Sequence, residues 1–155
     1  MATRETEMKR TALAMWQGNF RKGHGSITLL DGGISDIPFS YKSRFEGETA
    51  LSPEGLLAAA HAASFAMSFA KHLDALDVKS DRIDTVATVK VEEVNGLDTV
   101  TRIDLELVVH THSCRHDQVR EAAKYAASDC TISRLINAEI TLVARIAEFK
   151  NFSAA

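Results

Sequence analysis

The sequence contains only two cysteines and two prolines, and it has no surplus of positive charge. Two cysteines in 155 residues are too few for the disulfide framework of a small secreted domain. Two prolines and eight glycines argue against a long disordered tract. A formal net charge of −3, without a basic block, gives little attraction to nucleic acid or to an anionic membrane. We therefore expect neither a nucleic-acid partner nor a membrane partner.

A long hydrophobic run is also missing. The longest stretch without a charged residue, 55–70, is shorter than the roughly 20 apolar residues that a membrane-spanning helix needs. The N-terminal sequence "MATRETEMKR" lacks the apolar segment of a secretory signal peptide. With so few cysteines, this predicts a cytoplasmic location. A hydrophobic content of 45% with 25% charged residues predicts a single globular domain over residues 1–155.

The first half of the chain predicts three short strands followed by a long helix. Aromatic and β-branched residues between glycine-bearing breaks indicate strands in "ALAMWQGNF", "HGSITLL" and "PFSYKSRF". Ser52 then suits the N-cap and Pro53 the first position of a helix that runs to about Leu76. Because Ala, Leu, Phe and Met occupy nearly all of its sides, we expect this helix to be central and buried.

The second half predicts a hairpin, two helices and a closing strand. Asn95 and Gly96 supply the turn between "IDTVATVKVEEV" and "TVTRIDLELVVHT", and alternating apolar residues in the second segment indicate one face on a core. An amphipathic helix is predicted for "HDQVREAAKYAA". A short helix with Asp129 as a possible cap is predicted for "DCTISRLI", and a strand for "AEITLVARIAEF". Strands and helices in separate blocks indicate an α+β fold.

A stripe of polar side chains interrupts the long apolar helix. At about 100° per residue, its members fall within an arc of about 80°: Glu54, His61, Ser64, Ser68 and His72. The ordinary explanation is that the serines bond carbonyls one turn back and the histidines find common partners. Together with Arg44, which lies among carboxylates in "SRFEGE", the stripe instead predicts a small polar pocket in apolar walls.

These motifs resemble the OsmC/Ohr family of osmotically induced proteins and organic hydroperoxide resistance proteins, on its OsmC side. The resemblance extends from about Leu13 to Arg145 and rests on the hairpin and on four other segments: "WQGNFRKGHG", "SRFEGE", "SPEGLLAAAHAASFAMSF" and "AASDCTISRLINAEITL". It implies antiparallel sheets around a long buried helix, in an intertwined homodimer with pockets at the subunit interface. The need of the apolar helix for further cover also favours a dimer.

The resemblance implies a thiol peroxidase for oxidative or osmotic stress defence that uses no metal, flavin or haem. A peroxidatic cysteine on the long helix attacks an organic hydroperoxide, a resolving cysteine then forms a disulfide, and a dithiol or lipoyl-type reductant resets the site. By this resemblance Arg44 lowers the pKa of the reacting thiol, Glu54 orients Arg44, and Cys130 is the resolving cysteine.

Ser64 stands where the family has its peroxidatic cysteine. A serine hydroxyl is not appreciably ionised at neutral pH and cannot form a sulfenic acid, so we expect the chain as written to be inactive as a peroxidase. Two explanations stay open: a deliberate replacement of the reactive cysteine by its near-isostere, or a natural member that has lost the chemistry. In the second case the pocket would bind a small amphiphilic or anionic ligand without catalysis.

Three further site hypotheses are weaker. His110, His112 and Cys114 alternate along a predicted strand and could ligate zinc, although a polar strand end is the simpler explanation. A Ser64, His61 and Glu54 hydrolase triad lacks the usual nucleophile turn. Cys130 acting alone is less probable than an inert, half-buried thiol. For His61 itself, we expect a core histidine that is hydrogen-bonded across the dimer.

Overall fold

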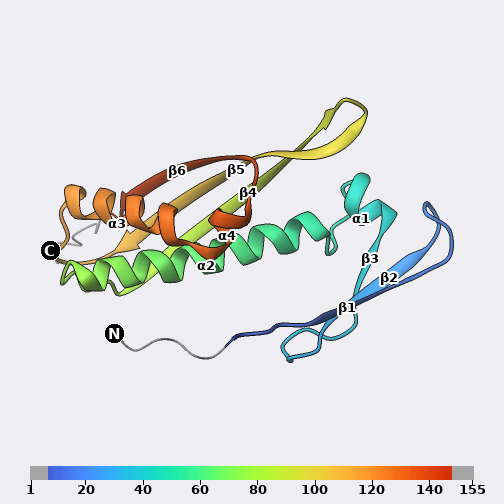
Figure 1. Ribbon diagram of the computed structural model, residues 1–155, viewed down its shortest axis with the longest axis horizontal. Helices are drawn as coiled ribbons and strands as arrows, with labels where there is room; N and C mark the ends of the chain where they lie inside the picture. Colours follow the sequence, from blue (N-terminus) through green and yellow to red (C-terminus); the bar gives the residue numbers. More distant parts are fainter. Residues whose placement is uncertain (1–6, 148–155) are drawn as a thin grey trace, which may run out of the picture. The chain divides into compact units, whose positions relative to one another are not determined.

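The computed structural model describes residues 7–147, which divide between Leu56 and Leu57 into two compact units (Figure 1). The elements in chain order are β1 Ala12–Gln17, β2 His24–Leu29, β3 Ile37–Ser40, α1 Tyr41–Phe45, α2 Pro53–Ala75, β4 Arg82–Val94, β5 Leu97–His110, α3 His116–Asp129, α4 Thr131–Leu135 and β6 Glu139–Ile146. This content confirms the predicted α+β class. The single domain over the whole chain stays a prediction.

The first unit is an antiparallel sheet in the order β1-β2-β3, followed by α1. Gly25 in the central strand permits close packing, because a Cβ atom there would lie 2.3 Å from the carbonyl oxygen of Met15. The prediction of a third strand through "PFSYKSRF" is wrong in its second half. The strand ends at Ser40, whose Oγ accepts a hydrogen bond from Ser43 N at 3.1 Å while Ser43 Oγ accepts one from Ser40 N at 2.9 Å. This reciprocal capping starts α1.

Helix α2 begins at Pro53 as predicted, and Ser52 Oγ accepts the Gly55 N–H at 3.0 Å. It ends at Ala75, where Asp77 takes a φ of +55° and Val78 N–H bonds the Leu73 carbonyl at 2.9 Å. Its buried residues recur at every fourth position: His61, Phe65, Phe69 and Leu73. Within a single chain the helix therefore buries one face, and Met67 is 76% exposed.

The second unit contains a sheet in the order β4-β5-β6. The predicted hairpin is confirmed, with Asn95 at φ +54° and Gly96 at φ +79° in its turn. The expectation of antiparallel sheets is wrong for one strand, because β6 runs parallel to β5. Helices α3 and α4 provide the crossover that two parallel neighbours require. Strand β6 ends at Ile146, and the predicted continuation to Phe149 lies outside the described residues.

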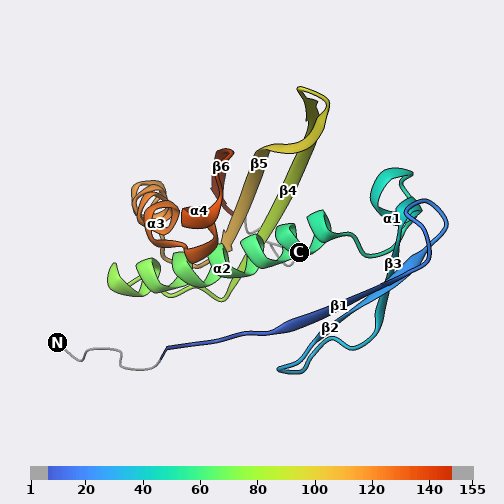
Figure 2. The ribbon, with the colours of Figure 1, turned by 45° about the vertical axis from the view of Figure 1, so that its right-hand side comes forward.

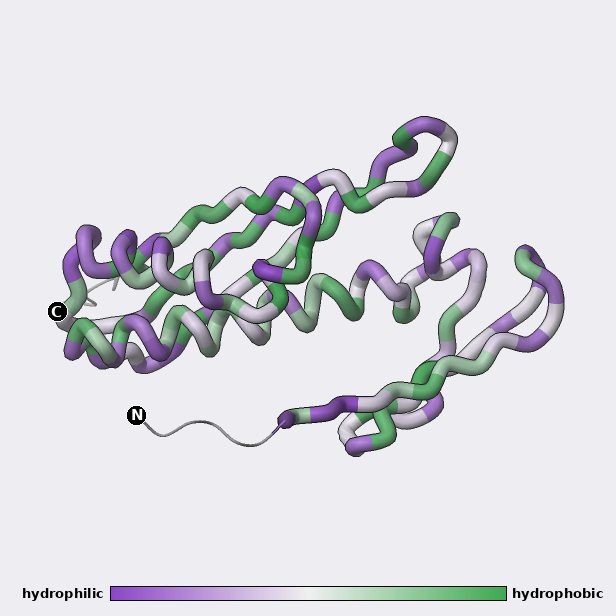
Figure 3. The backbone as a smooth tube through the Cα atoms, viewed as in Figure 1, coloured by the Kyte–Doolittle hydropathy of each residue, from purple (hydrophilic) through white to green (hydrophobic). Residues whose placement is uncertain are grey.

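The core of this unit lies between the sheet and helices α2 and α3, which occupy the same side of it (Figure 1, Figure 2). Apolar segments recur along β6 and α2 (Figure 3). The alternation predicted for β5 is confirmed, since its buried residues are Ile103, Leu105, Leu107 and Val109. Cys130 also belongs to this core. Within residues 7–147, no helix combines the length and the hydropathy that crossing a membrane requires.

Candidate functional site

Ser64 and Cys130 are in direct contact. Ser64 Oγ lies 3.3 Å from Cys130 Sγ, and the two residues are 66 positions apart in the chain. Ser64 lies on α2. Cys130 lies between α3 and α4, where it is both the C-cap of one helix and the N-cap of the next, and it is only 1% exposed. The predicted cap residue, Asp129, is instead the last residue of α3.

The surroundings of Cys130 favour its ionised form. Ser133 N–H points to Cys130 Sγ at 3.5 Å, and Ser64 Oγ contacts the same sulfur. Burial raises the pKa of the Cys130 thiol, but the side chains of Ser133 and Ser64 together with the backbone N–H groups of Ser133 and Ile132 outweigh it and leave the pKa below its ordinary value. In contrast, burial and the nearby Asp117 raise the pKa of Cys114. Both cysteines are free thiols.

His61 is fully buried, and its Nε2 lies 2.8 Å from Ser133 Oγ. Burial lowers the pKa of His61, so its imidazole is neutral at pH 7. Its Nδ1 has no hydrogen-bond partner within the described part of the chain. The Nε2 bond lies within the chain, and the expected bond across a dimer stays a prediction. The hydrolase triad is not formed either, because Ser64 contacts Cys130 and Glu54 contacts Arg44.

The C-terminal part of the polar stripe converges on Asp129, next to Cys130. Ser68 Oγ donates to this carboxylate, Lys71 Nζ lies 2.7 Å from it and His72 Nε2 lies 2.8 Å from it. The ring of Tyr125 stacks on His72 at 5.4 Å. Hydrogen bonds from Lys71, Ser68 and His72 hold the pKa of Asp129 far below its usual range, against a smaller opposing effect of burial. The stripe therefore ties α2 to the junction that carries Cys130.

Arg44 and Glu54 form the ion pair that the sequence predicts. Arg44 Nε lies 3.0 Å and its Nη2 2.9 Å from Glu54 Oε1. Arg44 comes from α1 and Glu54 from the first turn of α2, and both belong to the first compact unit. Two donors on one oxygen fix the direction of the guanidinium group.

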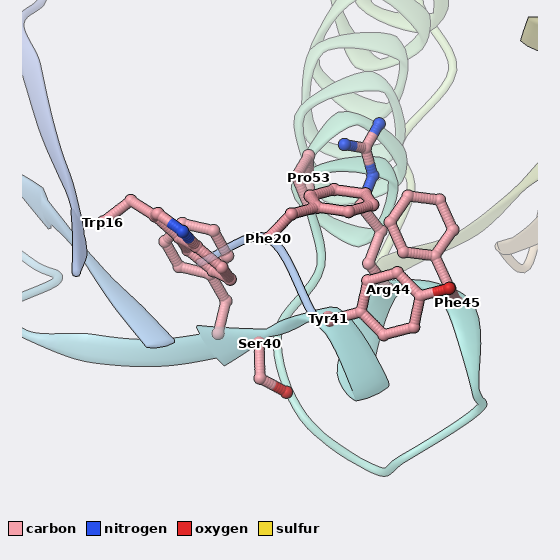
Figure 4. Close-up of a pocket in the computed structure, with 8 residues that line it drawn as sticks. Trp16, Phe20, Ser40, Tyr41, Arg44, Phe45 and Pro53 are labelled. Carbon is pink, nitrogen blue, oxygen red and sulfur yellow. The ribbon is translucent and has the colours of Figure 1, made fainter. Parts of the chain in front are cut away.

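An apolar pocket of about 280 Å³ lies beside Arg44 in the same unit (Figure 4). Its aromatic walls include Trp16, Phe20, Tyr41 and Phe45, and the ring centroids of Phe20 and Tyr41 are 5.1 Å apart. The guanidinium carbon of Arg44 lies 5.0 Å from the centre of the Phe45 ring. The arrangement combines one cation with a wall of aromatic rings, which suits a ligand with an apolar body and a polar end.

The zinc hypothesis for "HTHSCRH" is not supported. Within residues 7–147, no three His, Cys, Asp or Glu side chains gather as a metal-binding group. His110 Nε2 contacts Asp84 at 2.9 Å, and His112 Nε2 lies 3.5 Å from Asp81. Each histidine therefore faces a carboxylate on or beside β4 rather than Cys114.

Ser133 and the residues of the aromatic pocket were not among the predicted site residues. The spacing of Cys130 and Ser133 is a usable signal, because a residue three positions after an N-cap presents its N–H to the cap side chain. The aromatic pocket is harder to find from sequence. Tyr41 and Phe45 share a face only because α1 is a helix, and that helix was predicted as a strand.

The chain belongs to the OsmC-like family. The sequence profile of the family described as OsmC-like protein matches residues 45–144. Peroxiredoxin OsmC of Escherichia coli strain K12 is 32% identical over 129 residues, which span 83% of this chain and 90% of that protein. The peroxiredoxin OsmC of Shigella flexneri matches with the same identity and coverage.

Solved structures agree with this assignment at the level of the fold. An OsmC-like protein from Mycoplasma pneumoniae superposes with a TM-score of 0.73 at 11% identity, covering 92% of this chain and 100% of that one. The organic hydroperoxide resistance protein OhrB of Bacillus subtilis superposes with a TM-score of 0.60 at 24% identity, covering 88% of this chain and 98% of that one.

Proposed function

We propose that the chain has the scaffold of an OsmC-type organic hydroperoxide reductase, in which Ser64 occupies the place of the peroxidatic thiol. Its site would consist of position 64, Cys130, Arg44 and Glu54, and it would use no metal, flavin or haem. As written, the chain would not turn over hydroperoxide. The observation that carries the proposal is the 3.3 Å contact between Ser64 Oγ and Cys130 Sγ.

This contact suits the two sulfur steps of a thiol peroxidase. A thiolate at position 64 would attack the hydroperoxide, the O–O bond would break, and the alkoxide would leave with a proton as alcohol. The sulfenic acid so formed would react with the Cys130 thiol, making an S–S bond and releasing water. An external dithiol, such as a lipoyl-type compound, would restore both thiols by exchange. The serine oxygen supports neither step, because it has no sulfenic-acid chemistry.

Arg44 and Glu54 would supply the positive charge that ionises the reacting thiol. An isolated thiol with a pKa of about 8.5 is only about 3% ionised at pH 7, so a nearby guanidinium raises the reactive fraction strongly. The two contacts to Glu54 Oε1 keep Arg44 oriented. The aromatic pocket beside Arg44 would receive the apolar part of an organic hydroperoxide.

We further propose that the functional form is a homodimer in the cytoplasm. Support for the dimer comes from large apolar side chains that a single chain leaves open, among them Met67 at 76% exposed and Phe20 at 63%. The two free cysteines fit a reducing compartment. Sedimentation equilibrium should give twice the chain mass at micromolar concentration, and a monomer throughout would contradict the dimer.

The apolar pocket also supports a second function, a non-catalytic binder of a small amphiphilic or anionic ligand. It combines aromatic walls with the Arg44 guanidinium and does not depend on the residue at position 64. The two functions differ in what a thiol at that position would do. A peroxidase site regains turnover with the thiol, whereas a binding site does not.

The deciding experiment is Ser64→Cys with cumene hydroperoxide and dihydrolipoamide as the reductant. We expect sustained hydroperoxide consumption by this variant and none by the unchanged chain. Adding Cys130→Ser should stop turnover after a single oxidation, because the sulfenic acid then has no internal partner. Adding Arg44→Ala should slow the reaction on the order of tenfold at neutral pH, with recovery at high pH, where the thiol ionises unaided. A folded Ser64→Cys variant without activity would rule out the peroxidase and favour the binder.

A further inference from the structure

The hydrogen-bonding groups around the Cys130 sulfur include the Ser133 N–H and the Ser64 hydroxyl. The Ser133 N–H donates to the sulfur at 3.5 Å, and the Ser64 hydroxyl, 3.3 Å away, can either donate or accept. A thiolate accepts both contacts, whereas a thiol would have to donate its proton to Ser64. In a core position that is 1% exposed, the N–H contact therefore favours the ionised sulfur.

His61 anchors Ser133 beside the sulfur. Its Nε2 lies 2.8 Å from Ser133 Oγ, and the backbone N–H of the same serine reaches the Cys130 sulfur. Ser133 therefore meets a fully buried imidazole through its side chain and the sulfur through its backbone.

We propose that His61 and Ser133 are positioning residues for Cys130: the hydrogen bond between His61 Nε2 and Ser133 Oγ holds Ser133 so that its backbone N–H is directed at the Cys130 sulfur. This keeps the buried thiol ionisable and aimed at position 64. The role concerns the resolving step and therefore rests on the proposed function, but the state of the Cys130 thiol can be measured without any peroxidase activity.

In the resolving step the Cys130 thiolate attacks the sulfenic acid at position 64. The S–S bond forms, the S–O bond breaks, and the leaving hydroxide takes up the proton that Cys130 had released, giving water. Neither His61 nor Ser133 is consumed. Without its anchor to His61, Ser133 no longer holds its N–H at the sulfur, which raises the pKa of the attacking thiol and so reduces its reactive fraction at neutral pH.

Other ionisable groups on the surrounding helices are engaged elsewhere. Asp129 precedes Cys130, but its carboxylate accepts hydrogen bonds from Ser68, Lys71 and His72. Arg134, the residue after Ser133, is exposed. The strand that packs against this core contributes apolar side chains, Leu105 and Leu107 among them. In contrast, Ser133 contacts the Cys130 sulfur and His61 contacts Ser133.

The test is the ionisation midpoint of Cys130, followed by the ultraviolet absorbance of its thiolate in a Cys114→Ser background, so that Cys130 is the remaining cysteine. We expect Ser133→Ala and His61→Leu each to raise the midpoint by about one pH unit. The rate of labelling by methyl methanethiosulfonate at pH 7 should then fall about tenfold. His61→Gln, whose side-chain amide can donate to Ser133, should recover part of the shift.

Ser128→Ala is the matched control, because its hydroxyl bonds the Tyr125 carbonyl at 2.8 Å on the exposed side of α3. A purely structural role for His61 predicts lower stability with an unchanged midpoint. Folded Ser133→Ala and His61→Leu variants with the ionisation midpoint of the parent would overturn the proposal. If His61→Leu does not fold, the midpoints of Ser133→Ala and His61→Gln decide between the two roles. In the Ser64→Cys protein, Ser133→Ala should slow disulfide formation and not the first oxidation. If Ser64→Cys had no peroxidase activity, the proposed function would fail, but the shift of the Cys130 ionisation midpoint in these variants would still be expected.

Discussion

Replacing Ser64 by cysteine should allow a disulfide with Cys130 that stabilises the fold. The Ser64 oxygen and the Cys130 sulfur are 3.3 Å apart, and a disulfide bond is about 2.05 Å long, so the two atoms need to approach by about 1 Å. The bridge would close a loop of 66 residues. In the chain-entropy treatment, such a loop lowers the entropy of the unfolded chain by about 15 cal/mol/K, which corresponds to about 4 kcal/mol at 25 °C.

The assay compares oxidised and reduced Ser64→Cys protein in thermal and urea unfolding, at one protein concentration and in a Cys114→Ser background. At about 2–4 °C per kcal/mol for a chain of this size, the melting temperature of the oxidised form should rise on the order of 10 °C. The urea m-value should fall, because the crosslinked unfolded chain exposes less surface. Ser64→Cys with Cys130→Ser should show no difference between oxidising and reducing buffer. A Ser64→Cys protein that stays reduced under mild oxidant, or that oxidation destabilises, would refute the geometry on which the site rests.

Two further changes test the packing and the electrostatics around this site. Phe69→Ala, at a fully buried position, should lower the unfolding free energy measured in urea by about 3–5 kcal/mol. Leu135→Ala, at a position 73% exposed, should change it by less than about 0.5 kcal/mol. Equal losses in the two variants would contradict the assigned core. Because the pKa of Asp129 lies far below its usual range in the folded protein, its carboxylate stabilises the fold above about pH 4, and this contribution is lost as the pH falls further. Asp129→Asn should therefore flatten the acid limb of a stability-against-pH curve, and the exposed Asp74→Asn should not.

The elements that sequence predicts well are those whose signals are local. Ser52 and Pro53 define the start of α2, and Asn95 with Gly96 defines the hairpin turn, because capping and positive-φ turns depend on a few adjacent residues. Helix α1 was missed although its capping box is local, since Tyr41 and Phe45 also suit a strand.

Pairing between segments that are distant in the chain could not be predicted from the sequence. The parallel direction of β6 depends on the path of two helices, and nothing in "AEITLVARIAEF" itself distinguishes the two directions. The polar stripe on α2 was visible, but its partners were not. Asp129 and Ser133 are more than 55 residues away from the histidines of α2 that they contact. Only the packing of the crossover against α2 shows that His72 bonds Asp129 and His61 bonds Ser133.

Cys130 lies at a joint rather than inside a helix. Its backbone has φ −59° and ψ +121°, which belongs to neither α3 nor α4. Even so, its N–H donates to the Ala126 carbonyl at 2.9 Å and its carbonyl accepts the Arg134 N–H at 3.1 Å, so the last hydrogen bond of one helix and the first of the next share this residue. Making or breaking a covalent bond at the sulfur would therefore act on the ends of two helices at once.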